Sequence, residues 1–381
     1  MGQLLLFRPR PKDDELLSSW LVRLAWANLT KVHPFTRRLF DGDRTLWQID
    51  LDRSCPEKYL ERLSNATGVP VARVSETTLR GLGGVLFEDS ESCVNTQWLL
   101  EIKKRGRARL GYAQQYCPLC LSEDPEPYFR RMWRLAFSVV CPKHRVVMLD
   151  ACPVCRSCVA FHTADYGDWL YRHPMNLARC VSCGADLRTL SRDDLQAAPD
   201  ALCGFVGQLQ DILTLDESSA PREDVAIPLV LYKGLHVLAS AMASMGATAK
   251  LRDVIARRHG LLPLSPAFGR CRGRFENLRV GDRFLLLSYV QDLFMDWPVG
   301  FVSLAKQIRL SSSYFQRYRA TIPYWVEQPI RWALYGKHYS PSEMEWAAAA
   351  EWLRRSGRTV NPNTVRKALG VAYKQKAKRA S

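Results

Sequence analysis

Four closely spaced pairs of metal-binding side chains lie in the middle of the sequence. The stretch YCPLCLSEDPEPYFRRMWRLAFSVVCPKH, residues 116–144, begins with one pair and ends with another, and CPVC and CVSC pairs follow. The candidate ligands are Cys117, Cys120, Cys141, His144, Cys152, Cys155, Cys180 and Cys183. Two ligands separated by two residues lie on one side of a tight turn, and two such turns supply the tetrahedron of soft ligands that Zn²⁺ prefers. The sequence therefore predicts two zinc ions per chain.

The spacing leaves the grouping of the pairs open. The spacings are C-x2-C-x20-C-x2-H and C-x2-C-x24-C-x2-C when the pairs are taken in order. This sequential grouping is favoured, whereas an interleaved grouping would place Cys117 and Cys120 with Cys152 and Cys155. Cys158 continues the run and is an alternative ligand. A redox pair of the thioredoxin kind is disfavoured because four half-sites occur together. The other cysteines are predicted to be core thiols: Cys55, Cys93, Cys203 and Cys271.

The predicted metal role is structural. A site filled by four protein ligands leaves no position for water or substrate. The chain lacks the G-x4-G-K-[ST], H-E-x-x-H and G-x-S-x-G motifs of common nucleotide-binding and hydrolytic sites. We therefore predict that the protein is not an enzyme. A nuclease or recombinase is the less favoured alternative. It is kept because the acidic triad of such an enzyme has no fixed spacing by which the sequence could show or exclude it.

Composition and charge indicate the kind of partner. The chain has 381 residues, 47% of them hydrophobic, and a formal net charge of +16. Such a composition is typical of a globular protein with two or three domains. The positive charge favours an anionic partner, with nucleic acid first. The N-terminal apolar run is too short for a signal peptide, and no stretch approaches the roughly 20 apolar residues of a membrane span. We expect an intracellular protein without a membrane partner.

The elements around the zinc segment are predicted to be helical. Over residues 13–28 the apolar positions form one helical stripe that follows acidic residues, whose charge favours a helix N-terminus. Residues 57–80 predict a helix, a break at 68–70 and a second helix, which fits a helix-turn-helix or a plain hairpin. Residues 128–140 predict one amphipathic element, and the polar stretches 191–200 and 216–224 predict flexible connections.

The predicted fold class is mainly α with small zinc-ribbon or zinc-knuckle modules. We divide the chain into an N-terminal helical domain, residues 1–110, a tandem zinc region, residues 111–190, and a C-terminal helical domain, residues 191–381. In the last of these, "AIPLVLYKGLHVLASAMASM" and "FLLLSYVQDLFMDWP" predict core helices.

Two C-terminal stretches, residues 301–320 and 345–370, have the outline of a helix-turn-helix. In the first, a helix is predicted to end near Leu310, and in the second Gly357 is predicted to break a helix. Residues 300–381 hold 15 Lys or Arg and 4 Glu, which is a net +11 of the chain's +16. Phosphate contacts are therefore expected here. The candidate nucleic-acid-binding residues are Ser312, Tyr314, Gln316, Arg317, Asn363, Thr364, Arg366 and Lys367.

The N-terminal half resembles the TniQ family of transposition proteins. "LFRPRPKDDELLSSWLVRLA", residues 6–25, is similar to the opening of that family, a Pro-containing segment before a helix of the type ES-x-x-SW-x-x-RLA. This chain departs from the pattern at Leu16, where the family often has Ser. "LSNATGVPVARVSETTL" and the zinc segment with its Trp between the knuckles also fit the family. The resemblance covers roughly residues 6–190.

The resemblance implies a role in choosing where a DNA transposon inserts. TniQ and the related TnsD proteins select a target and help to recruit an AAA+ ATPase, and they are not the transposase. Some members bind a DNA site, and others dock, often as dimers, onto an RNA-guided CRISPR complex. The implied partners are thus DNA, an AAA+ ATPase regulator, an RNA-guided complex and a second copy, in the bacterial cytoplasm at the nucleoid. A zinc-containing transcription regulator is the alternative, and neighbouring transposase and ATPase genes would distinguish the two.

Overall fold

The fold within the part of the chain that the structure describes is mainly helical. The computed structural model describes residues 4–43, 45–88, 96–102, 112–166, 176–214, 228–244, 249–259, 274–310, 315, 322–334 and 342–369. These residues form fourteen α-helices and one sheet of two short strands. The predicted fold class is confirmed.

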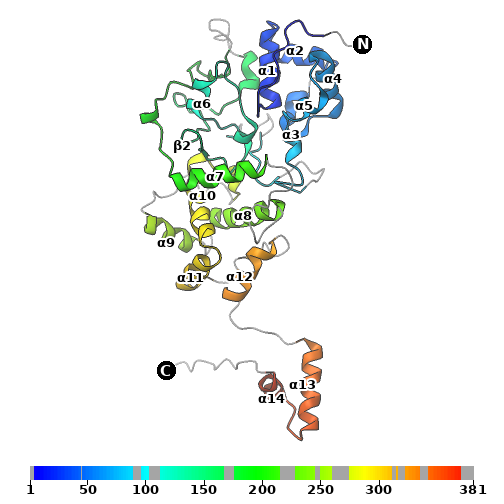
Figure 1. Ribbon diagram of the computed structural model, residues 1–381, viewed down its shortest axis with the longest axis vertical. Coiled ribbons are helices and arrows are strands. Elements are labelled where there is room, and N and C mark those ends of the chain that lie inside the picture. Colours follow the sequence, from blue (N-terminus) through cyan, green and yellow to red (C-terminus); the bar gives the residue numbers. More distant parts are fainter. Residues whose placement is uncertain are drawn as a thin grey trace.

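The N-terminal helices lie close together (Figure 1): α1 packs on α2 and α3, and α4 packs on α5 and α2. Their bounds are α1 Leu17–Ala27, α2 Val32–Leu39, α3 Leu51–Ser54, α4 Glu57–Thr67 and α5 Val71–Ser75. The apolar stripe predicted for α1 is buried throughout. α4 ends at Gly68, which has a φ of +71° and needs the left-handed conformation that glycine adopts without a penalty.

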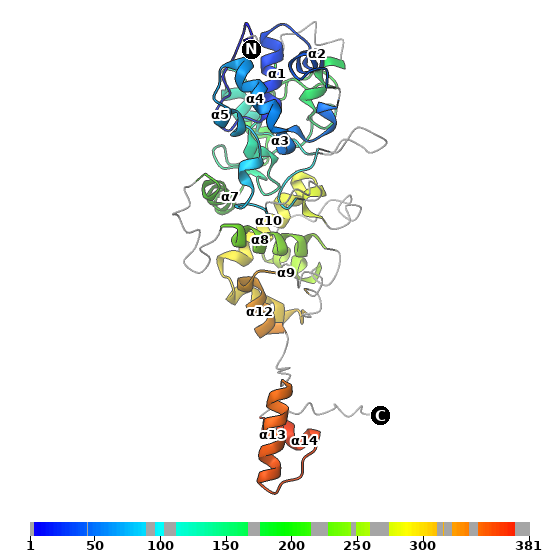
Figure 2. The same cartoon turned by 90° about the vertical axis from the view of Figure 1, so that its right-hand side faces the viewer.

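The central part has little regular structure. Its elements are α6 Pro118–Glu123, β1 Val140–Cys141, β2 Val146–Val147 and α7 Asp200–Ile212. β1 and β2 pair antiparallel, with Val140 opposite Val147. The C-terminal elements are α8 Pro228–Ala243, α9 Ala249–His259, α10 Val280–Met295, α11 Val299–Gln307, α12 Tyr324–Leu334, α13 Glu343–Arg355 and α14 Pro362–Ala368. Figure 2 shows α8, α9 and α10 close together, and α8 and α10 are the two core helices predicted from the sequence.

One hydrophobic core runs from Leu16 to Ile330, and α13 and α14 share a separate one. The large core crosses both expected domain boundaries. For example, the indole of Trp98 donates to the carbonyl of Tyr232 at 2.9 Å and meets Phe137 and Phe275 edge to face. The division into three domains stays a prediction.

Several predicted local features were wrong. The acidic residues before α1 lie outside its first turn, because the helix begins only at Leu17. Residues 128–140 are not one amphipathic element: they contain a 3₁₀ helix at Arg131–Arg134 followed by extended chain. The flexibility predicted for residues 191–200 stays a prediction; this stretch contains a capped 3₁₀ helix, Arg192–Asp194, and the buried Leu195. Residues 216–224 lie outside the described residues. α11 ends at Gln307, three residues before the predicted end near Leu310.

Candidate metal centres

The first cluster of candidate ligands joins the start of a helix to a β-hairpin. Cys117 is the residue before α6, and Cys120 lies in the first turn of that helix. Cys141 ends β1, and His144 lies in the turn that leads to β2. Pro118 favours this helix start because its fixed φ suits the first helical position. The fold thereby brings together two ligand pairs that are separated by 20 residues in the sequence.

The distances in this cluster fit a tetrahedral zinc site. The Nδ1 atom of His144 lies 3.4 Å from the sulfur of Cys117, 3.3 Å from that of Cys120 and 3.4 Å from that of Cys141. The sulfurs of Cys120 and Cys141 are 3.6 Å apart. Zinc bonds of about 2.3 Å to sulfur and about 2.0 Å to nitrogen would give edges of about 3.8 Å between two sulfurs and about 3.5 Å between sulfur and nitrogen. All four side chains are buried.

Glu123 contacts the His144 ring on the side that faces away from the other three ligands. The Nε2 atom of His144 lies 2.8 Å from the carboxylate of Glu123, at the end of α6. When Nδ1 binds a metal, Nε2 carries the proton and donates it, which is the usual arrangement of metal-binding histidines. Lys143 also contacts this carboxylate, at 2.5 Å, and its hydrogen bond is the main cause that lowers the pKa of Glu123. No pattern in the sequence singles out Glu123.

The second cluster consists of two similar turns. The sulfur of Cys152 lies 3.8 Å from that of Cys183, and the sulfur of Cys155 lies 3.6 Å from that of Cys180. This cluster is less protected than the first, since Cys183 is exposed and Cys155 is half-buried. Four thiolates at this separation also suit Zn²⁺. Cys158 belongs to neither cluster.

Both clusters thus have the sequential grouping. Three of the four turns share one backbone feature: the residue after the second ligand is left-handed. These residues are Arg145, Arg156 and Gly184, with φ of +54°, +61° and +75°. Each donates its N–H to the carbonyl of the first ligand of its own pair, at 2.8 to 3.0 Å. This closes the turn and directs both ligand side chains to the same side.

The thiols of the first cluster strongly perturb one another's pKa values. Hydrogen bonds from the side chains of Cys117 and Cys120 lower the pKa of Cys141 to about 2. The pKa of Cys120 is raised, chiefly by its contacts with Cys117 and Cys141. A divalent cation would stabilise all of the thiolates together. The donor set therefore fits a bound metal ion better than free thiols.

The segment that resembles the TniQ opening has a structural role. Glu15 accepts from the hydroxyl of Ser19 at 2.9 Å and forms an ion pair with Arg23 at 2.7 Å. The Ser19 hydroxyl in turn accepts from the backbone N–H of Phe129 at 3.1 Å. The indole of Trp20 donates to the carbonyl of Pro9 at 2.7 Å. These buried contacts tie α1 to the segment between the first two ligand pairs.

A second, partly buried contact ties the metal region to the C-terminal helices. Arg279, the residue before α10, forms a two-pronged ion pair with Asp150 at 2.7 and 3.0 Å. The same carboxylate accepts from the N–H of Val280 at 2.8 Å, in the first turn of α10. Asp150 lies two residues before Cys152. The second cluster is therefore anchored to the start of α10.

The candidate nucleic-acid residues are only partly within the described chain. Ser312, Tyr314, Gln316 and Arg317 lie outside the described residues. Asn363, Thr364, Arg366 and Lys367 lie on α14, which has Asn361 as its N-cap, as predicted. Asn363, Arg366 and Lys367 are exposed.

The hydroxyl of Thr364 is used within the protein, because it donates to the carbonyl of Thr359 and accepts from the N–H of Asn361. Gly357 follows α13 with a φ of +66°, as expected for a helix break. The connection between α13 and α14 is longer than the three or four residues typical of a helix-turn-helix. The turn between α4 and α5 has that length, but α5 is short and its Arg73 is paired with Asp13 and Glu76.

Of the thiols predicted to be ordinary core residues, Cys55 and Cys203 are buried, and Cys93 and Cys271 lie outside the described residues. Among the described helices, none is long and apolar enough to cross a membrane.

Comparison with known proteins bears on the N-terminal part of the chain. No curated protein matches the sequence. The family model of TniQ matches residues 6–148. The match begins before α1 and ends just after β2, so it contains the α1 network and the whole first ligand cluster, and it stops before Cys152. Residues 6–148 are therefore similar to the TniQ family, and the match covers the N-terminal part of the chain alone.

Proposed function

We propose that this protein is a non-catalytic adaptor that selects the target site for DNA transposition. The observation that carries the proposal is the TniQ match over residues 6–148. The buried network of α1 supports it, because the side chains that resemble the family's opening stabilise the scaffold and leave no catalytic group among them. In this role the chain binds the target and recruits an AAA+ ATPase, which licenses insertion by a separate transposase.

We propose that both clusters hold Zn²⁺ and that its role is to fold the central region. The sulfur and nitrogen donors and their separations favour zinc over hard cations. Regular structure between residues 112 and 166 amounts to one short helix, two short strands and isolated 3₁₀ turns. Metal binding supplies about 10 kcal/mol or more per structural site. Zinc would thereby stabilise the central region, on which both the N-terminal helices and α10 pack.

We propose that the C-terminal region contacts DNA. The exposed Arg366 and Lys367 on α14, with Asn363 beside them, form one basic surface, and residues 300–381 carry a net charge of +11. Guanidinium and ammonium groups bind phosphate, and an arginine on an exposed helix can also read guanine in the major groove. The N-terminal region would then serve as a scaffold, the zinc region would bind the metal ions, and the C-terminal region would contact DNA.

The proposed partners follow from the family role. They are target DNA, the AAA+ ATPase, an RNA-guided CRISPR complex in systems that use one, and a second copy of the chain. The direct test is co-purification of the ATPase on DNA that carries the bound adaptor. We expect ATPase recruitment to require intact metal clusters, and recruitment that is equal without this protein would refute the proposal.

A further inference from the structure

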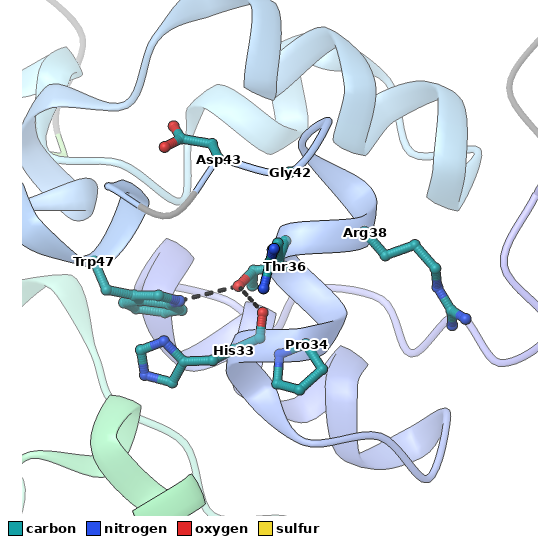
Figure 3. A pocket seen from close by; sticks show the side chains of 8 residues that line it. His33, Pro34, Thr36, Arg38, Gly42, Asp43 and Trp47 are labelled. Carbon is teal, nitrogen blue, oxygen red and sulfur yellow. Dashed lines mark hydrogen bonds between the residues drawn. The ribbon is translucent and has the colours of Figure 1, made fainter.

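A cavity lies between α2 and the segment that follows it (Figure 3). It has a volume of about 580 Å³. Its lining residues are His33, Pro34, Thr36, Arg37, Arg38, Gly42, Asp43 and Trp47. It is remote in sequence from α14 and belongs to neither metal cluster. A volume in the range of about 300–1,000 Å³ is typical of small-ligand sites.

One end of the cavity is aromatic and rigid. The ring of Trp47 stacks on that of His162 with centroids 5.6 Å apart and planes 13° apart. His33 lies against the same indole at 6.0 Å with a tilt of 54°. The indole N–H donates to the hydroxyl of Thr36 at 3.1 Å, and that hydroxyl is also bonded to the backbone of α2. Figure 3 shows Trp47, His33 and Thr36 grouped together. The indole is thereby fixed in position and still partly exposed.

The other side of the cavity is cationic. Arg37 and Arg38 are exposed, and neither has a carboxylate partner among the described residues. Figure 3 shows the Arg38 side chain extending away from Trp47. Four other arginines of the same part of the chain are paired with acids: Arg23 with Glu15, Arg62 with Asp41, Arg73 with Asp13 and Arg80 with Glu57.

The acid that lines the cavity is already engaged. Asp43 accepts from the hydroxyl of Tyr59 at 2.5 Å and from the N–H and hydroxyl of Thr45 at 2.6 and 2.7 Å. The nearby Asp41 is paired with Arg62. Two guanidinium groups therefore remain available to an anion that enters from solvent.

We propose that this cavity binds a nucleotide unit of a nucleic-acid strand, with the phosphate at Arg37 and Arg38 and the base at the Trp47 end. Guanidinium groups suit phosphate oxygens, and a fixed aromatic ring suits a base of any sequence. This contact is additional to the one proposed for α14 and does not depend on it. Two arginines in the last turn of a helix can also simply complement its dipole. That simpler role predicts a loss of stability without a loss of binding.

The test is a salt titration of oligonucleotide binding by fluorescence anisotropy, with labelled single-stranded DNA and RNA. We expect the double substitution R37A/R38A to flatten the slope of log affinity against log salt by about 1.4 units, for two lost contacts to a single strand. The matched control is R8A/R10A, which removes two exposed and likewise unpaired arginines of the same part of the chain, away from the cavity. R37K/R38K should restore most of the slope.

The aromatic end is tested separately. Trp47→Leu should weaken binding about tenfold or more, and Trp47→Phe should weaken it less because a ring remains. Cross-linking of a 4-thiothymidine oligonucleotide should label a peptide that contains residues 33–47. The proposal is overturned if R37A/R38A and R8A/R10A give equal slopes and no cross-link falls in this segment. Tight binding of ADP or inorganic phosphate without binding of a strand would assign the site to a free ligand and would also overturn it.

The α14 variant Arg366→Ala distinguishes this failure from failure of the proposed C-terminal contact. In that background, the contribution of Arg37 and Arg38 to the salt slope should be unchanged. Thermal unfolding of each variant shows whether the fold is retained.

Discussion

Arg134 donates to Asp52 across 2.9 Å, and both side chains are completely buried. Asp52 also accepts from the N–H and the hydroxyl of Ser18 in α1, at 2.7 and 2.8 Å. Arg134 further contacts Asp50 at 2.5 Å and the carbonyl of Leu100 at 2.7 Å. This network joins α1, the start of α3 and the segment between the first two ligand pairs. It holds the first metal cluster against the N-terminal helices.

The charge of Asp52 makes stability depend on pH. Burial raises its pKa to about 6, although the nearby Arg134 opposes the shift. An unfolded aspartate has a pKa of about 3.9, so the folded state binds the proton more tightly. The stabilising contribution is complete below about pH 4 and is lost as the pH rises through about 6.

Asp52→Asn cannot titrate and should remove this dependence. As the pH rises through this window, the free energy of unfolding of the natural protein should fall relative to that of the variant. The fall should be up to about 1.4 kcal/mol per pH unit. Denaturant unfolding with zinc present, at several pH values from 4.5 to 7, measures it. Glu61→Gln, at an exposed acid of α4, is the control. A difference that is constant with pH would contradict the assignment.

Glu123 should tune the metal affinity of the first cluster. Glu123→Gln replaces the carboxylate that accepts the Nε2 proton of His144 with a weaker acceptor, so zinc should bind this site about 10- to 100-fold more weakly. Competition with a chromophoric chelator measures the affinity. Glu61→Gln, an exposed change in α4, is the matched control. An unchanged affinity for Glu123→Gln would show that the contact does not support the ligand.

The two clusters should release metal at different rates. Cys183 of the second cluster is exposed, whereas all four candidate ligands of the first are buried. A chelator should therefore remove one equivalent quickly and the second slowly. Cys183→Ser should abolish the fast phase, and Cys120→Ser should abolish the slow one. Release of both equivalents in one phase would contradict the difference in protection.

Two measurements test the proposed DNA contact of the C-terminal region: the sequence dependence and the salt dependence of DNA binding. Arg366→Ala should cost about 1–3 kcal/mol at a preferred site if the side chain reads a base, and a small, uniform amount on all sequences if it contacts phosphate. Removal of residues 341–381 deletes nine basic and three acidic side chains. If about three of the basic groups contact phosphate, the salt slope should flatten by roughly 3 units. Identical slopes for the full and shortened chains would show that this region does not contact DNA.

The sequence was most informative where chemistry depends on local spacing. Each ligand pair, the apolar stripe of α1 and the cap at Asn361 involve residues that are close in sequence. Such local patterns can be recognised from the sequence alone. The contacts of Asp52 with Arg134 and of Asp150 with Arg279 join residues 82 and 129 positions apart. No local pattern marks such pairs, and only the fold brings them together.

The irregular segments were the hardest to predict for the same reason. Residues 128–140 combine three arginines with mostly apolar side chains, a composition that predicts an amphipathic element. In the fold they are buried on several sides by α1, the hairpin and the C-terminal helices, so Phe129 and Phe137 are both fully buried. Tertiary packing, together with the ligand turns on either side, decides the conformation there.

We propose above that the protein directs insertion without catalysing it. The most direct measurement is sequencing of insertion sites in cells that express the transposase and ATPase of the same element, with the natural protein, with a Cys117→Ser variant or with neither. We expect insertions to be concentrated at a defined target with the natural protein, and to be lost or dispersed with the variant and without the protein. An unchanged distribution of insertions in all three cultures would contradict it.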